Sequence, residues 1–256
     1  MIRQEIRTLQ AALLFFTRIP SSVLGEPSGD SFHNASRYFP FIGWVVGVVG
    51  AGTVVGGSFF LPLSLAILMS IAMTILMTGA LHEDGFADFC DGFGAGLTKE
   101  HILDIMKDSY IGVFGVIGLL LMLGMKMLAL RSLPITVLPM AIISGHSLSR
   151  FLSISLLATH TYARHDVSSK SRVVVKRMTI RELLFAAILG ILPFFFMCLM
   201  VSQWRLFGIG LLTTGLSRWL FGQFLTVKIQ GYTGDCLGAL QQISEVVFYM
   251  TVVAVQ

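Results

Sequence analysis

The chain has 256 residues, of which 55% are hydrophobic and 12% charged, and its formal net charge is +4. Charged residues make up about a quarter of an ordinary soluble domain, so this composition excludes a soluble globular fold. The three cysteines show no CxxC pairing, which argues against a disulfide framework or a zinc finger. We therefore expect an all-α, polytopic integral membrane protein, and nothing in residues 1–256 marks a boundary between domains.

The N-terminal stretch predicts a helix that does not cross the membrane. The apolar run Leu9–Ile19 is too short to cross a hydrocarbon core of about 30 Å, and Arg18 and Pro20 lie at its end. We expect an interfacial or re-entrant helix there. Asn34 and Arg37 follow, close to the membrane surface, and Arg37 is either a positive anchor or a ligand for phosphate.

Long apolar runs come next, and most have the roughly 19–25 residues that a membrane-crossing helix needs. We expect about 6–7 transmembrane helices, the last of them the weakest because polar residues crowd its start. Glycines in the first two runs permit close helix packing. The runs are Phe41–Leu61, Leu63–Leu81, Ile111–Leu130, Leu133–Ala158, Leu183–Val201, Leu206–Val227 and Ile243–Val255.

An acidic segment between Gly79 and Gly112 interrupts these runs. If it is helical from about Leu81, three aspartates fall on one face, where their mutual repulsion favours a bound hard divalent cation such as Mg²⁺. The glycine run 92–96 is expected to break this helix, and Thr98 to cap a second one that carries Asp104 and Asp108 one turn apart. The segment therefore reads as a helical hairpin. It contains half of the 14 acidic residues: Glu83, Asp84, Asp88, Asp91, Glu100, Asp104 and Asp108.

Several later residues can have either an ordinary structural role or a functional one. Ionisable groups at membrane depth usually face a cavity or a partner. We expect Arg150 to face substrate, whereas Lys126 and Arg218 are expected to pair or to extend toward the membrane surface. In the basic loop 159–182, positive charge can mark topology alone, or Arg164 or Lys170 can receive phosphate. His160 and His165 are interpreted as plain loop histidines.

The last polar segment, GYTGDCLGALQQISE, places a carboxylate at the start of a helix. Asp235 is either a simple N-cap or part of a site, with Glu245 following at helical spacing.

Lysines and arginines are distributed unevenly along the chain. If the N-terminus is inside, the outer links hold only Arg131 and Arg205, and most other basic residues fall on inner segments. This asymmetry predicts an N-in topology with the acidic hairpin and the polar loops in the cytoplasm. The positive net charge is thereby explained without nucleic acid.

Three segments together resemble one enzyme family. LHEDGFADFCDGFG, IMKDSYIGVFG and GYTGDCLGALQQISE are similar to the signature set of the cobalamin synthases, or adenosylcobinamide-GDP ribazoletransferases. TRIP at residues 17–20 and SRYFPFIGWVVG at residues 36–47 match the same family, so the likeness spans nearly the whole chain. Such enzymes are polytopic proteins of the bacterial inner membrane. The resemblance implies that adenosylcobinamide-GDP is joined to α-ribazole or its 5′-phosphate, with Mg²⁺ as cofactor and GMP as product.

The acidic motif is also similar, more faintly, to the two-metal motif of the CDP-alcohol phosphotransferases. Gly96 stands where that family has arginine, and the gap to Asp104 is shorter. That likeness implies a role for Asp108 as the base. In our hypothesis, Mg²⁺ is bound by Asp84, Asp88, Asp91 and Asp108 with support from Glu83 and Asp104. The substrate phosphates are contacted by Lys107, Arg37 and Arg150. The rest of the site is expected from Asp235, Glu245 and the nearby Asn34.

Two other classes of function stay open at this point. Carboxylates near membrane spans also mark ion pathways, so a divalent-cation transporter is the main competitor. A structural subunit is the third interpretation, and it predicts no magnesium-dependent activity. Contacts with lipid are expected in every case, and a homo-oligomer or a complex with other cobalamin-assembly enzymes is compatible with the sequence.

Overall fold

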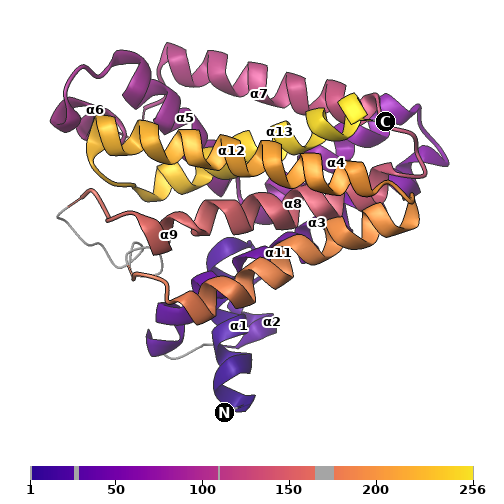
Figure 1. Cartoon of the computed structure of the whole chain (residues 1–256), viewed down its shortest axis with the longest axis horizontal. Coiled ribbons are helices and arrows are strands. Elements are labelled where there is room, and N and C mark those ends of the chain that lie inside the picture. The colour runs from indigo at the N-terminus through magenta and orange to yellow at the C-terminus, as the bar shows by residue number, and fades with distance from the viewer. Residues whose placement is uncertain (1, 26–28, 109, 165–175, 256) are drawn as a thin grey trace.

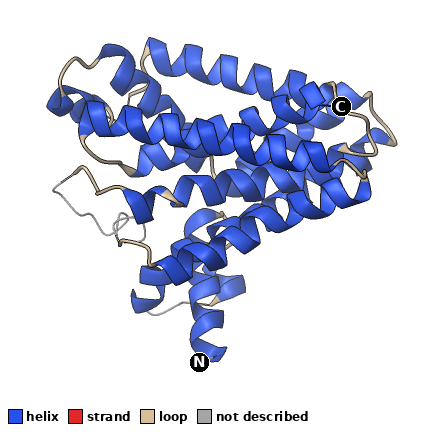
Figure 2. Ribbon diagram, viewed as in Figure 1, coloured by secondary structure: helices blue, strands red, loops and turns tan. Residues whose placement is uncertain are grey.

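The computed structural model describes residues 2–25, 29–108, 110–164 and 176–255. Within these ranges nearly every residue is helical, and the described residues contain no strand (Figure 2). The all-α prediction is confirmed, while His165 and Lys170 lie outside the described residues. The elements are α1 (Ile2–Phe16), α2 (Ser21–Leu24), η1 (Gly29–Tyr38), α3 (Phe39–Ser58), α4 (Leu63–Thr78), α5 (Leu81–Ala95), α6 (Lys99–Ile105), α7 (Val113–Arg131), α8 (Leu138–Ile154), α9 (Leu156–Thr159), α11 (Ile180–Met200), α12 (Trp204–Ile229) and α13 (Gly234–Val255).

The described helices confirm a polytopic membrane protein. Five are long and apolar enough to cross a membrane, and α4 with α5 makes a sixth if that bent pair is one span. The 26-residue α12 is longer still but less apolar, because it carries Arg205, Arg218 and Lys228. In Figure 1, α7, α8, α11 and α12 run along the long axis of the molecule, whereas α1 runs across them.

The second predicted span is shorter than expected. We predicted Leu63–Leu81, but α4 ends at Thr78 and α5 leaves it at 90°. Two consecutive residues in the left-handed region make this bend: Gly79 at φ 64° and Ala80 at φ 58°. Their N–H groups donate to carbonyls of the last turn of α4, a common way to end a helix. The acidic helix α5 therefore turns away from the direction of the span before it.

The N-terminal helix is fixed to this bend. The backbone N–H of Arg18, just beyond α1, donates to the carbonyl of Met77 at 2.7 Å. A Cβ added to Gly79 would lie 2.0 Å from Nε of Arg18. The positive φ of Gly79 and this close approach both favour glycine, and the hydrogen bond from Arg18 holds the end of α1 against the end of α4.

The weakest predicted span lies at the centre of the fold. Helix α13 begins at Gly234, nine residues before the predicted start at Ile243, and packs against α5, α7, α8 and α12. The polar residues that made this run look weak face the interior of the protein instead of lipid, and Gln241 and Glu245 are both buried. Hydropathy alone underestimated this helix because its polar groups have protein partners.

Glycines in α3 allow the close packing that the sequence predicted. A Cβ at Gly43 would lie 2.4 Å from the carbonyl oxygen of His146, and one at Gly47 would lie 2.7 Å from Cα of Ile143. Both contacts are with the backbone of α8, so α3 and α8 touch directly. Gly52 on the same helix has open space around it, so this role does not extend to every glycine of the run.

Candidate functional site

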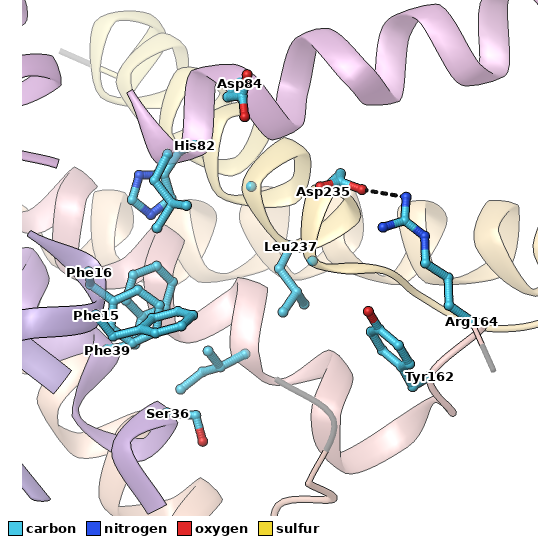
Figure 3. Close-up of a pocket in the computed structure, with 14 residues that line it drawn as sticks. Phe15, Phe16, Ser36, Phe39, His82, Asp84, Tyr162, Arg164, Asp235 and Leu237 are labelled. Carbon is cyan, nitrogen blue, oxygen red and sulfur yellow. Dashed lines mark hydrogen bonds and ion pairs between the residues drawn. The ribbon is translucent and has the colours of Figure 1, made fainter. Parts of the chain in front are cut away.

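A cavity of about 300 Å³ opens where five parts of the chain meet. Its walls come from α1, the η1–α3 junction, α5, the end of α8 with the segment that follows it, and the first turns of α13. Figure 3 shows aromatic rings gathered on one side and an arginine–aspartate pair on the other. The lining includes Phe15, Phe16, Ser36, Phe39, Leu81, His82, Asp84, Ile154, Tyr162, Arg164, Asp235 and Leu237.

Two close-packed helices bring carboxylates together at the polar end of this cavity. A Cβ at Gly85 of α5 would lie 3.0 Å from Cα of Asp235 on α13, so the two backbones nearly touch. Asp84 precedes that contact and lines the cavity, and Asp88 lies one helical turn later, half-buried. The carboxylate of Asp88 interacts electrostatically with those of Asp84 and Asp235.

Arg164 supplies positive charge beside these carboxylates. Its Nη2 donates to Oδ2 of Asp235 at 3.0 Å and to the carbonyl of Met106 at 3.2 Å. Its Nε is buried and has no hydrogen-bond partner within the described part of the chain. The N-cap role that we considered for Asp235 belongs to Thr233, whose hydroxyl accepts from the N–H of Cys236 at 3.3 Å. Asp235 is thus available to orient Arg164.

Asp91 is engaged in holding the neighbouring helix. Its Oδ2 accepts from the N–H of Gly112 at 2.7 Å and its Oδ1 from the N–H of Gly115 at 2.8 Å. Those donors belong to the N-terminus of α7, where backbone N–H groups lack intrahelical partners. The carboxylate is 6% exposed and lies against both glycines, since a Cβ on either would approach it to 2.4 Å.

The second arm of the predicted hairpin lies apart from the cavity. Helix α5 continues through Gly92 and Gly94 and ends at Ala95, with Gly96 as its C-cap, so the predicted break within the glycine run 92–96 is confirmed. Those glycines allow close contact with Met106 and Phe114. Thr98 caps α6 as predicted, accepting from the N–H of His101.

Two acidic residues of this arm are exposed to solvent. Asp104 lies on α6, and Asp108 lies in the turn beyond its end, so the expectation of one helix carrying both was wrong. The N–H of Tyr110 donates to Oδ1 of Asp108 at 3.3 Å. Lys107 is exposed beside them. None of these three side chains lines the cavity.

The predicted substrate-binding residues before α3 have partners elsewhere. Nη2 of Arg37 donates to Oε2 of Glu5 on α1 at 2.5 Å, and the hydroxyl of Tyr38 donates to the same oxygen at 2.6 Å. Asn34 accepts a hydrogen bond from Nζ of Lys176. These contacts fix η1 between α1 and the start of α11.

A second polar cluster lies inside the bundle, around Glu245 of α13. Its Oε1 accepts from the hydroxyl of Tyr249 at 3.0 Å and lies 3.2 Å from Nζ of Lys126, and its Oε2 accepts from Nε2 of Gln241 at 2.6 Å. Lys126 was expected to pair or to reach the membrane surface, and it pairs. Glu245 is 1% exposed.

The cluster extends to the residues next to the cavity. Nζ of Lys126 donates to Gln242 at 2.7 Å, and Gln242 in turn donates to Oε1 of Glu83 at 2.8 Å. On the other side, Nη1 of Arg150 lies 3.0 Å from Nδ1 of His146, which is 3.4 Å from Glu245. Glu83, Arg150 and Glu245 thus lie in the core behind the cavity, whereas Asp84 points into it.

The donor set at the polar end suits Mg²⁺ bound together with a phosphorylated substrate. Among the residues that the structure describes, no three His, Cys, Asp or Glu side chains converge closely enough to hold a metal alone. Mg²⁺ commonly takes one or two carboxylates together with substrate phosphates and waters, so Asp84 and Asp88 fit. With Asp235 and Arg164, this end carries a formal charge of −2, which would repel an anionic substrate unless a cation came with it.

The aromatic wall and His82 are features that sequence reasoning missed. Phe15, Phe16 and Phe39 read as ordinary apolar residues, because each lies in an apolar stretch. His82 directly precedes the acidic pair Glu83 and Asp84, and its place inside the LHEDG motif was the only signal available. Long-range packing brings these rings to one cavity, because Phe16 of α1 stacks on Phe39 of α3 and Phe39 in turn stacks on His82 of α5.

Comparison with known proteins gives a consistent result. The profile of the cobalamin-5-phosphate synthase family matches residues 8–253. A protein of Shewanella frigidimarina named adenosylcobinamide-GDP ribazoletransferase is 39% identical over 98% of this chain and 96% of its own length. Proteins of the same name from Shewanella amazonensis and Leptospira interrogans are 37% and 35% identical, each over 97% of this chain and 95% and 96% of their own lengths. No solved structure matches significantly.

Proposed function

The chain belongs to the cobalamin-5-phosphate synthase family, and from this premise we propose that it joins adenosylcobinamide-GDP to α-ribazole or its 5′-phosphate, releasing GMP. The observation that carries this proposal is the cavity in which Asp84, Asp235 and Arg164 meet an aromatic wall. A nucleotide-activated substrate and a nucleoside acceptor need both surfaces: charge for the phosphates and apolar rings for a base. The reaction is one of the last in cobalamin assembly.

In the proposed reaction a ribazole hydroxyl oxygen forms a bond to the phosphorus attached to the corrinoid arm. The pyrophosphate P–O bond breaks and its electron pair leaves with GMP. Asp84, at the cavity wall, accepts the hydroxyl proton on the carboxylate oxygen that is not needed for Mg²⁺. Arg164 donates from its unpartnered Nε to a phosphate oxygen while Asp235 holds the guanidinium in place.

Magnesium is part of this proposal, held by Asp84 and Asp88. When bound, Mg²⁺ neutralises charge on the pyrophosphate oxygens and on the leaving phosphate. The close approach of α5 and α13 at Gly85 supports the assignment, because it keeps these two carboxylates beside Asp235.

We further propose that the cavity lies on the cytoplasmic side of the bacterial inner membrane. Support comes from the uneven distribution of lysine and arginine between the two sides. The apolar helices require a membrane, and soluble nucleotide substrates reach the cavity from the cytoplasm under this orientation.

The test is GMP release and cobamide formation by the purified protein in lipid, with and without Mg²⁺. We expect Asp84→Asn and Asp88→Asn to lower turnover at least about a hundredfold, with the unfolding temperature unchanged. Glu100→Gln, which removes an exposed carboxylate from α6, is the matched control and keeps full activity. Undiminished turnover by both aspartate variants would contradict the proposed site, and absence of product from the unaltered protein would contradict the function.

A further inference from the structure

The cavity has two chemically different ends, and the residues of the proposed reaction all lie at the polar one. The other end is walled by aromatic and aliphatic side chains, with His82 and Ser36 as its polar groups (Figure 3). An apolar surface of this kind binds an apolar part of a substrate. Its side chains are Phe15, Phe16, Phe39, Leu81, Ile154 and Leu237.

The aromatic wall is held in place before any substrate arrives. The ring of Phe39 stacks on that of Phe16 with centroids 4.1 Å apart and on the imidazole of His82 at 5.4 Å. The guanidinium of Arg150 lies over the Phe39 ring, 5.4 Å from its centroid. Neighbours on several sides therefore fix the orientation of this ring, so the aromatic wall is preorganised for a ligand.

The imidazole of His82 indicates which chemical group the ligand must carry. The side chain is 3% exposed and lines the cavity, yet its Nε2 is buried and has no hydrogen-bond partner among the residues that the structure describes. A buried polar atom left unpaired costs about 1–3 kcal/mol, so native structures nearly always satisfy it. A ligand with one hydrogen-bond acceptor near the aromatic wall would satisfy Nε2.

The size and polarity of the cavity indicate which part of the two substrates its apolar end binds. A volume of about 300 Å³ suits a nucleoside and is too small for a corrinoid. Guanine presents several donors and acceptors along its edge and would leave most of them unpaired against Phe, Leu and Ile side chains. A benzimidazole-type base is flat and apolar and has a single free ring nitrogen that accepts a hydrogen bond.

We propose that the apolar end of the cavity binds the aromatic base of the ribazole substrate, with the Nε2–H of His82 donating to the free ring nitrogen of the base. This inference rests on the proposed function, because it assigns one of its two substrates to a place. The base lies against the aromatic wall, and the sugar hydroxyl then extends toward Asp84 and Arg164. The corrinoid is left to approach from outside the cavity.

The experiment measures binding of two nucleosides by calorimetry, with the full chain in lipid nanodiscs and no turnover. The probes are α-ribazole and an analogue whose indole base has C–H in place of the free ring nitrogen. We expect the unaltered protein to bind α-ribazole about tenfold more tightly than the analogue. His82→Phe keeps a ring on Phe39 but loses the donor, so it should bind both nucleosides equally. His101→Ala, which removes an exposed histidine of α6, should keep the tenfold preference.

Equal affinity of the unaltered protein for the two nucleosides would overturn the inference, even if His82→Phe failed to fold. So would a His82→Phe variant that folds and keeps the preference, or one that raises the KM for adenosylcobinamide-GDP and leaves that for ribazole unchanged. Because binding is measured without the corrinoid, these outcomes are separate from failure of the proposed function, which would appear as absence of product when both substrates are supplied.

Discussion

The cluster around Glu245 and the group around Asp84 use the same kind of side chain for opposite purposes. Glu245 is 1% exposed, and hydrogen bonds and the cation of Lys126 surround it. Asp84 is exposed at the cavity, beside a half-buried Asp88 and an Asp235 that orients Arg164. A carboxylate that is fully satisfied inside the protein stabilises the bundle, whereas one left open to a cavity is available for a ligand.

The largest expected effect is on the buried cluster. Lys126→Met leaves the carboxylate of Glu245 without its cation, and breaking a buried ion pair in this way costs about 3–5 kcal/mol of unfolding free energy. Thermal unfolding in detergent measures the loss. The double variant Lys126→Met with Glu245→Gln removes both charges and should recover most of it. If the single variant unfolds like the unaltered protein, the distinction between the two groups fails.

Asp91 gives the next largest effect and sharpens the comparison, because it lies on the same helix as Asp84. Asp91→Ala removes the acceptor of two backbone N–H groups at the start of α7, so we expect a loss of about 2 kcal/mol. Gly115→Ala, which places a methyl group against the same carboxylate, should lose a similar amount. Asp91→Asn retains one acceptor. A folded Asp91→Asn protein without activity would move Asp91 into the metal site.

The exposed acidic residues of the α6 arm should matter less. Asp104→Asn and Asp108→Asn change side chains that do not line the cavity, so we expect less than about 0.5 kcal/mol in stability and less than about a twofold change in turnover. GMP release and thermal unfolding on the same samples check both values. A tenfold loss of turnover for Asp108→Asn would restore the role as base that sequence similarity implied.

The smallest expected effect is on the ion pair between Arg37 and Glu5. The hydrogen bond from Tyr38, together with the guanidinium of Arg37, lowers the pKa of the Glu5 carboxyl below its ordinary value. A lowered pKa in the folded state contributes stability above the unfolded value of about 4.3, and that stability is lost as the pH falls through the folded pKa. The stability difference between the unaltered protein and Glu5→Gln should therefore shrink below about pH 4. A difference that stays constant with pH would show that charge is not involved.

Local patterns predicted much of this fold. The start of α5 at Leu81 and the Thr98 cap depend on neighbouring residues and were found where expected. The apolar runs lie mostly in helices, although several of their ends, including those of the second and the last, differ from the predicted ones. The bend after α4 was not predictable, because Ala80 adopts a left-handed conformation that its residue type does not favour. The span through Glu245 was underrated because its polar groups are satisfied by partners on other helices.

The candidate site was predictable only in part. The spacing of Asp84 and Asp88 predicted that they share one helical face. In the structure α5 packs against α13 beside them, so both lie near Asp235, as predicted for a site built from the two segments. Glu83 and Asp91 have the same residue chemistry but point to other neighbours. Which partner each carboxylate finds depends on how α5 packs between α7 and α13, and spacing along one helix does not contain that information.

The hydrogen bond from the N–H of Arg18 to the carbonyl of Met77 joins the end of α1 to the last turn of α4, next to the bend from which α5 starts. Phe15 and Phe16 lie shortly before this junction on one side, and His82 and Asp84 lie shortly after it on the other. The opposite wall has an anchor of its own, because the N–H of Ala163 donates to the carbonyl of Tyr232 at 2.8 Å and Arg164 bonds to Asp235. Backbone hydrogen bonds thus hold both walls before a substrate arrives, as in a ligand site that is largely pre-formed.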